Sequence, residues 1–321
     1  MTRVSNSPVI RRLAIGCRRA STNGLSIGRS TRPAIARSSA ATCRANSLPA
    51  GSVATAKRCG RWRSLTTVSP VDVGQPPADQ PLTPQASARC RENWQAVCER
   101  VAAACRRAGR PPESVRVIGV TKYVGLAATR AVLAAGCHNL GESRPQALWE
   151  KASTISREGT TAVHWHLIGH LQRNKVARTL AAGPLIHTVD SERLAAAISR
   201  EAAAAGRDCE VLIEVNLAGD PGRSGVPPEA VAALAERVFS LPGLQLRGLM
   251  GMASHPEAGR DPRQEFAALR ELREAVAAGS PGCDGLPELS MGMSGDFEAA
   301  ILEGSTMVRI GSALFAGVDR A

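Results

Sequence analysis

The chain is poor in lysine and in aromatic residues. Its 321 residues hold four lysines against thirty-six arginines, and aromatic side chains make up 3% of the sequence. No stretch of the first 71 residues is apolar for long enough to form a secretory signal or a membrane span, and we expect no membrane partner. No Gly-x-Gly-x-x-Gly motif follows the first predicted strand, which disfavours a dinucleotide-binding open sheet.

Acidic residues are absent from residues 1–71, which contain thirteen Lys or Arg. The other 27 basic residues are balanced by 28 acidic residues in 72–321, so the net charge of +12 belongs to the N-terminal segment. A folded part near neutrality gives no indication of nucleic-acid binding, and we expect none. The Arg/Ser-rich composition of this segment, with the Pro-rich stretch 71–84 after it, predicts a disordered leader and linker over residues 1–84.

The leader has three interpretations. A start codon assigned too far upstream, or a dispensable tail, fits the heavy use of Arg, Ala, Gly and Pro. An organellar transit peptide has the same Arg-rich and acid-poor character. The third interpretation is a nucleic-acid-binding arm, which requires salt-sensitive retention on DNA.

Cysteine and histidine do not form a metal-binding pattern. The nine cysteines are scattered, with no Cys-x-x-Cys pair, which favours a reduced, intracellular protein. We therefore expect a cytoplasmic location, or a mitochondrial one if the leader is a genuine transit peptide. His164, His166 and His170 are close in sequence, but the first two alternate on a strand-like segment with apolar neighbours, and we expect no metal site.

Apolar strand-like runs alternate with Ala-rich helical segments after a first helix over 86–108, which ends at a Gly-Arg-Pro-Pro sequence. The predicted strands are 115–122, 137–140, 164–169, 185–190, 210–216, 244–252, 288–292 and 306–315. The helices between them are predicted near 126–135, 145–157, 173–182, 191–205, 228–240, 262–278 and 296–303. Eight parallel strands joined by helices predict an α/β fold, a single (β/α)8 TIM-type barrel over residues 85–321 with an extra N-terminal helix. A doubly wound open sheet is the alternative.

Lys122 is the best candidate for chemistry, because it closes the apolar run Val-Arg-Val-Ile-Gly-Val-Thr-Lys (115–122). An amine at the end of a buried strand loses its proton more easily than one in water, since a low dielectric disfavours the ammonium form. A neutral amine condenses with an aldehyde, and pyridoxal phosphate is the common biological aldehyde held in this way. The alternative is a lysine that only reaches from a strand end to solvent.

The C-terminal ends of barrel strands form the functional face of this fold. Polar residues predicted to lie there are Lys122, Asn139, His170, Asp190, Asn216 and Ser294.

Two segments near the end of the chain predict phosphate and ring contacts. Ser294 lies where a strand gives way to a helix, and the amides of Gly311 and Ser312 follow the eighth strand, so all three can face a phosphate. Arg309, two residues before that turn, is predicted to project into the barrel mouth. A guanidinium cannot accept a proton, so it would keep a pyridine nitrogen unprotonated and weaken the ring as an electron sink. Taken singly, Ser294 and Gly311 are equally well explained as ordinary cap and turn residues.

A set of segments in order along residues 86–318 resembles the pyridoxal phosphate homeostasis protein family. The segments are Val-Ile-Gly-Val-Thr-Lys (117–122), Asn-Leu-Gly-Glu-Ser-Arg (139–144), His-Trp-His-Leu-Ile-Gly-His-Leu-Gln-Arg-Asn-Lys (164–175), His-Thr-Val-Asp-Ser (187–191), Leu-Ile-Glu-Val-Asn (212–216), Arg-Ser-Gly-Val (223–226), Leu-Arg-Gly-Leu-Met (246–250), Leu-Ser-Met-Gly-Met-Ser-Gly-Asp (289–296) and Gly-Ser-Thr-Met-Val-Arg-Ile-Gly (304–311). The chain departs from the family pattern at 143–147 and just after Met250, which affects rim contacts.

The resemblance implies a fold like the N-terminal barrel of alanine racemase, with pyridoxal phosphate as cofactor. It implies that Lys122 is the Schiff-base lysine, that Ser294, Gly311 and Ser312 contact the phosphate, and that Arg309 faces the pyridine nitrogen. Asn139, in the second matching segment, is also predicted to contact the cofactor.

A racemase of this fold needs a second base opposite the lysine, which related enzymes take from a tyrosine in a separate domain. We expect no domain after the eighth strand, and the single tyrosine, Tyr123, is predicted to lie on the opposite side of the strand from Lys122. His166, His170 and Lys175 are possible substitutes that are better explained as rim structure. We therefore predict no catalytic residue and a monomeric, non-catalytic carrier that serves pyridoxal phosphate-dependent apoenzymes. The alternative is a racemase or lyase of the same fold, and a third hypothesis is a cofactor-free interaction protein.

Overall fold

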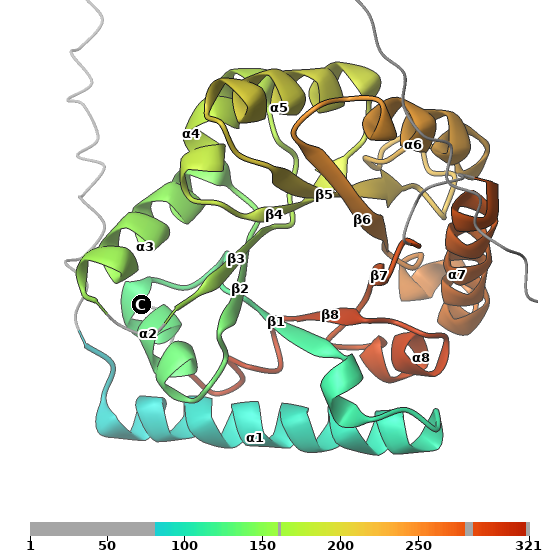
Figure 1. The fold of residues 1–321 in the computed structure, drawn as a ribbon. Coiled ribbons are helices and arrows are strands. Elements are labelled where there is room, and N and C mark those ends of the chain that lie inside the picture. Colours follow the sequence, from blue (N-terminus) through green and yellow to red (C-terminus); the bar gives the residue numbers. More distant parts are fainter. Residues whose placement is uncertain (1–80, 160–161, 280–284, 319–321) are drawn as a thin grey trace, which may run out of the picture. The chain divides into compact units, whose positions relative to one another are not determined.

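The computed structural model describes residues 81–159, 162–279 and 285–318, and the predicted leader lies outside the described residues up to position 80. The described part opens with helix α1 (Pro84–Arg107), which runs along one side of a ring of strands and helices (Figure 1). Thr83 caps α1 by accepting a hydrogen bond from the Ala86 amide at 3.1 Å, and Gly109 ends it with a positive φ of 65°. The extra N-terminal helix is therefore present.

Eight parallel strands close into a barrel in the order in which they occur in the chain, and β8 pairs with β1. The strands are β1 (Arg116–Val120), β2 (Asn139–Glu142), β3 (His164–Leu167), β4 (Leu185–Val189), β5 (Cys209–Val215), β6 (Leu244–Gly251), β7 (Glu288–Met293) and β8 (Met307–Ile310). The helices that follow them are α2 (Leu126–Ala134), α3 (Pro145–Arg157), α4 (Val176–Ala181), α5 (Glu192–Ala204), α6 (Val231–Phe239), α7 (Pro262–Gly279) and α8 (Phe297–Leu302). The predicted (β/α)8 barrel is confirmed.

Three predicted strand boundaries were wrong in ways that affect the site. Strand β1 ends at Val120, so Lys122 lies in the following turn. Strand β2 begins at Asn139, so this residue opens its strand and does not lie at the C-terminal end as predicted. Strand β8 ends at Ile310, and the residues predicted to extend it to 315 form turns. In β2 the ladder continues through Gly141 and Glu142, which are not apolar, whereas turns begin soon after Val120 and Ile310.

Side chains fill the barrel interior in layers. Five buried apolar residues from alternate positions of the strands form a separate inner cluster: Ile118, Leu185, Leu212, Met250 and Met307. The main apolar cluster lies between the strands and the surrounding helices, and α1 contributes Cys90, Val97, Val101, Ala104 and Cys105 to it. Cys98, on the same helix, is only partly buried. None of the helices that the structure describes carries an apolar stretch long enough to cross a bilayer.

Gly248 marks a tight contact between β6 and β7. It pairs with Glu288, and an added Cβ would collide with the Glu288 carbonyl, which is backbone and cannot move aside. We expect Gly248→Ala to lower the free energy of unfolding by about 3 kcal/mol, measured by urea denaturation. The control is Gly125→Ala, because nothing lies within 4 Å of a Cβ added there and its φ is −75°. Equal stability of the two variants would contradict this account of barrel closure.

Candidate functional site

Lys122 lies in the turn Thr121–Val124 that follows β1, and its side chain is partly exposed. The turn is closed by a hydrogen bond from the Val124 amide to the Thr121 carbonyl at 3.1 Å. The Lys122 Nζ atom lies 4.9 Å from the centroid of the Tyr123 ring, in a cation–π contact. The prediction that these side chains lie on opposite sides of a strand was therefore wrong, because alternation does not continue through a turn.

Ser294, Gly311 and Ser312 occupy the segments after β7 and β8, as predicted. The Ser294 hydroxyl accepts hydrogen bonds from the Gly311 amide at 3.2 Å and the Ala313 amide at 3.4 Å, so the two segments meet at one point. Ser312 lies between those amides and is exposed. A Cβ added to Gly311 would approach the Val120 Cβ to 3.3 Å, which places this turn against the end of β1, two residues before Lys122.

Arg309 is buried, with 5% of its surface exposed. Its Nη1 donates to the Ser290 carbonyl and to the Ser290 hydroxyl, each at 2.7 Å, and its Nη2 donates to the Gly251 carbonyl at 2.9 Å. Burial lowers the pKa of Arg309 to about 10, while the acidic groups of Asp296 and Glu214 oppose that shift. The guanidinium is thus fixed between β6, β7 and β8.

A chain of side-chain hydrogen bonds crosses the barrel interior from Asn139 to Arg309. The Asn139 Oδ1 lies 3.2 Å from His166 Nε2, and His166 Nδ1 lies 2.9 Å from His187 Nε2. His187 Nδ1 lies 2.9 Å from the Ser290 hydroxyl, which in turn contacts Arg309. Sequence reasoning missed His187 and Ser290, and the available signal was a polar residue at an inward position of an otherwise apolar strand.

His166 and His187, the two histidines of this hydrogen-bond network, are neutral. Burial lowers the pKa of His166 to about 3 and that of His187 well below its usual value, and the nearby cationic groups act in the same direction. Because both ring nitrogens of His166 are engaged with Asn139 and His187, this residue is not free to act as a second base. His170 lies instead on the surface, 3.5 Å from the Asp190 carboxylate.

Glu214 and Asn216 add two buried acceptors on β5 and at its end. Glu214 Oε1 accepts from the Ser224 hydroxyl at 2.7 Å, but Glu214 Oε2 and Asn216 Oδ1 have no hydrogen-bond partner among the described residues. Burial, the largest cause, raises the pKa of Glu214. Buried polar atoms without partners are rare in native proteins and indicate a place where a ligand or water donates. Glu214 was not singled out from the sequence.

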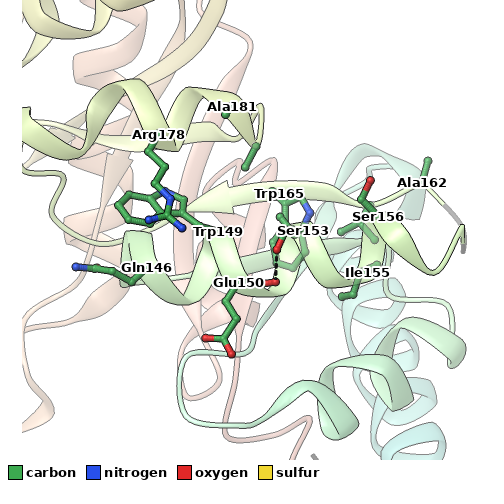
Figure 2. A pocket seen from close by; sticks show the side chains of 13 residues that line it. Gln146, Trp149, Glu150, Ser153, Ile155, Ser156, Ala162, Trp165, Arg178 and Ala181 are labelled. Carbon is green, nitrogen blue, oxygen red and sulfur yellow. Dashed lines mark hydrogen bonds between the residues drawn. The ribbon is translucent and has the colours of Figure 1, made fainter.

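A separate hollow of about 890 Å³ lies between α3 and α4 and contains none of the predicted site residues. Figure 2 shows Arg178 stacked on Trp149, and the Arg178 Cζ lies 4.3 Å from the centroid of the Trp149 ring. Since this hollow lies outside the strands and no primary amine is among the residues that line it, it is not the candidate site for a Schiff base. The segments at the ends of β1, β7 and β8 instead bring together the amine of Lys122, the hydroxyl of Ser294 with the Gly311 turn, and the fixed cation of Arg309.

The family model for the alanine racemase N-terminal domain matches residues 92–318. A pyridoxal phosphate homeostasis protein of Aquifex aeolicus is 38% identical over 224 residues, which is 70% of this chain and 96% of the relative. One of Pseudomonas aeruginosa is 38% identical over 228 residues, 71% of this chain and 95% of the relative.

Two solved structures have a fold similar to that of this chain. PipY of Synechococcus elongatus, solved with PLP bound, is 34% identical, has a TM-score of 0.60 and covers 68% of this chain and 100% of its own. An alanine racemase of Clostridium difficile, 16% identical with a TM-score of 0.52, covers 70% of this chain and 56% of its own and shares the fold.

The neutral histidines predict a pH-dependent stability. In the unfolded chain these imidazoles take up protons below about pH 6.5, and protons bound only by the unfolded state favour unfolding. The free energy of unfolding is therefore complete above pH 6.5 and falls as the pH is lowered toward 3, by up to about 1.4 kcal/mol per pH unit for each histidine. Urea titrations between pH 7 and pH 4 measure this slope.

The slope should be smaller in His187→Asn and unchanged in His255→Gln, because the His255 side chain is 69% exposed. An identical slope in all three proteins would mean that other groups cause the acid sensitivity.

Proposed function

Because the chain belongs to the pyridoxal phosphate homeostasis protein family, we propose that it holds pyridoxal 5'-phosphate as a Schiff base on Lys122 and acts in intracellular homeostasis of this vitamin B6 cofactor. The observation that carries the proposal is that the Ser294 and Gly311 segments meet each other and that Gly311 lies against Val120, two residues before Lys122. A PLP-bound relative with the same fold supports it.

The residues of this site suit the parts of the cofactor. The Lys122 nitrogen would form a C=N bond with the aldehyde carbon, and the aldehyde oxygen would leave as water. The phosphate would lie beside Ser294, Gly311 and Ser312, where the Ser294 hydroxyl and the Ser312 amide would donate to it, since the Gly311 amide already donates to the Ser294 oxygen. The predicted contact of Asn139 stays a prediction, because its side-chain oxygen is already bonded to His166.

Arg309 would face the pyridine nitrogen. Bound pyridoxal phosphate supplies an electron sink for a substrate carbanion, and its strength depends on protonation of the ring nitrogen. A guanidinium has donors only, so it would donate a hydrogen bond to an unprotonated ring nitrogen and could not accept one from a protonated nitrogen. The contacts with Ser290 and Gly251 prevent Arg309 from turning away, and the site therefore favours holding the cofactor over activating a substrate.

We also propose delivery to pyridoxal phosphate-dependent apoenzymes, because a Schiff base is covalent but reversible. We place this activity in a monomer in the cytoplasm, with residues 85–321 as the working domain. A racemase is the second candidate, since alanine racemase shares the barrel. Against it, His166 is engaged within the barrel and Tyr123 stacks on the Lys122 amine, so neither is positioned as an opposing base.

Lys122→Ala should abolish the visible absorbance of bound cofactor while leaving the thermal unfolding transition in place. Borohydride reduction of the native protein, followed by peptide mass mapping, should find a pyridoxyl group on Lys122. The matched control is Lys175→Ala, which should keep the adduct. An adduct that persists in Lys122→Ala and moves to Lys175 would refute the assignment, and the absence of any adduct in the native protein would refute the function.

The loaded protein should not racemise alanine. We expect D-alanine to form from L-alanine no faster than with an equal concentration of free pyridoxal phosphate, because neither His166 nor Tyr123 is placed as a base opposite Lys122. A chiral amino-acid assay measures both rates. Faster D-alanine formation that is lost in Lys122→Ala would favour the racemase and direct attention to His170 and Lys175.

A further inference from the structure

Lys151 is a buried lysine outside the predicted site. It lies on α3, and 9% of its side chain is exposed. Its Nζ donates to the Glu142 Oε1 at 2.6 Å, to the Thr121 carbonyl at 2.8 Å and to the Val124 carbonyl at 2.8 Å. An ammonium group has three N–H donors, so each one has an acceptor.

The two carbonyl acceptors belong to Thr121 and Val124, the first and last residues of the turn that carries Lys122. The same turn is held at Thr121 by its hydroxyl, which donates to Glu142 Oε1 at 2.6 Å, and by its amide, which donates to the Gly141 carbonyl at 3.0 Å. Glu142 belongs to β2 and Lys151 to α3. The pair therefore fixes the backbone on both sides of Lys122 to two other elements of the barrel.

Stability alone is a poor explanation for this arrangement. Removing two charges from water is unfavourable, and well-packed apolar side chains of similar volume are often as stabilising as a buried ion pair. Moreover, Glu142 Oε2 is buried without a partner among the described residues, which adds to the unfavourable desolvation. What an apolar pair cannot do is bind the Thr121 and Val124 carbonyls.

We propose that Lys151 and Glu142 are positioning residues that hold the Thr121–Val124 turn so that Lys122 meets the cofactor aldehyde in one orientation. The inference rests on the proposed function, with Lys122 as the reacting amine. It also explains why Lys151 would not compete with Lys122 for the cofactor, since an enclosed ammonium with three acceptors is not available to condense with an aldehyde.

The test measures the rate of adduct formation after adding pyridoxal phosphate to the apo protein, followed by visible absorbance. Lys151→Met should slow it about 10-fold to 100-fold, the range seen when a contact that orients a ligating side chain is lost. Amide hydrogen exchange on the apo protein should show faster exchange at Val124. Glu142→Gln, which keeps the shape of the side chain, should slow the rate in the same direction.

Two further variants separate positioning from stability. Lys151→Met with Glu142→Leu leaves no unpaired charge, so it should recover thermal stability relative to Lys151→Met while adduct formation stays slow. Glu303→Gln is the matched control, because Glu303 is a largely buried carboxylate that pairs with Arg263 and Arg270 at the end of α8. It should lose stability and keep the native rate.

The outcomes distinguish the two proposals. Native protein that forms the adduct on Lys122, with unchanged rates and unchanged Val124 exchange in folded Lys151→Met and in the double variant, would overturn the positioning role alone. Recovery of the native rate in the double variant would also overturn it, because stability would then be the cause. Native protein without an adduct on Lys122 would overturn both proposals.

Discussion

The buried guanidinium of Arg309 is the interaction on which the interior of this barrel depends. A cation enclosed by protein needs hydrogen-bond acceptors, and here two backbone carbonyls and one hydroxyl from β6 and β7 accept from Arg309. The Ser290 hydroxyl also contacts His187, which extends the constraint through His166 to Asn139 on β2. One charged side chain thus orders polar groups on five of the eight strands.

These hydrogen bonds explain how a small barrel can hold the groups of its site in fixed positions. The apolar inner cluster fills one level of the interior, and the polar chain occupies the neighbouring inward positions. The segments after β7 and β8 are joined by Ser294, and the turn after β1 is joined to β2 and α3 by Glu142 and Lys151. Each group of the candidate site is therefore supported from outside the segment that carries it, which favours a preorganised pocket.

The sequence was sufficient for the fold and for the positions of Lys122, Ser294 and Gly311, because strand periodicity, helix ends and glycine turns are local signals. Long-range pairing was not accessible in the same way. Nothing near Lys151 indicates that its amine reaches the carbonyls of Thr121 and Val124, and nothing near His187 indicates Ser290, 103 residues away. The limits predicted for β2, and with them the place of Asn139, were wrong because the ladder continues into Gly141 and Glu142, which are not apolar.

The burial of Lys151 has a consequence for chemical selectivity. A free aldehyde modifies any accessible primary amine, whereas a guanidinium stays protonated at physiological pH and does not condense with it. Between residues 81 and 318 the chain has three lysines, and one of them, Lys151, is buried in its ion pair with Glu142 and is not accessible. The positive surface charge there is carried almost entirely by arginine. Adventitious modification by a free aldehyde therefore has few targets in this part of the chain.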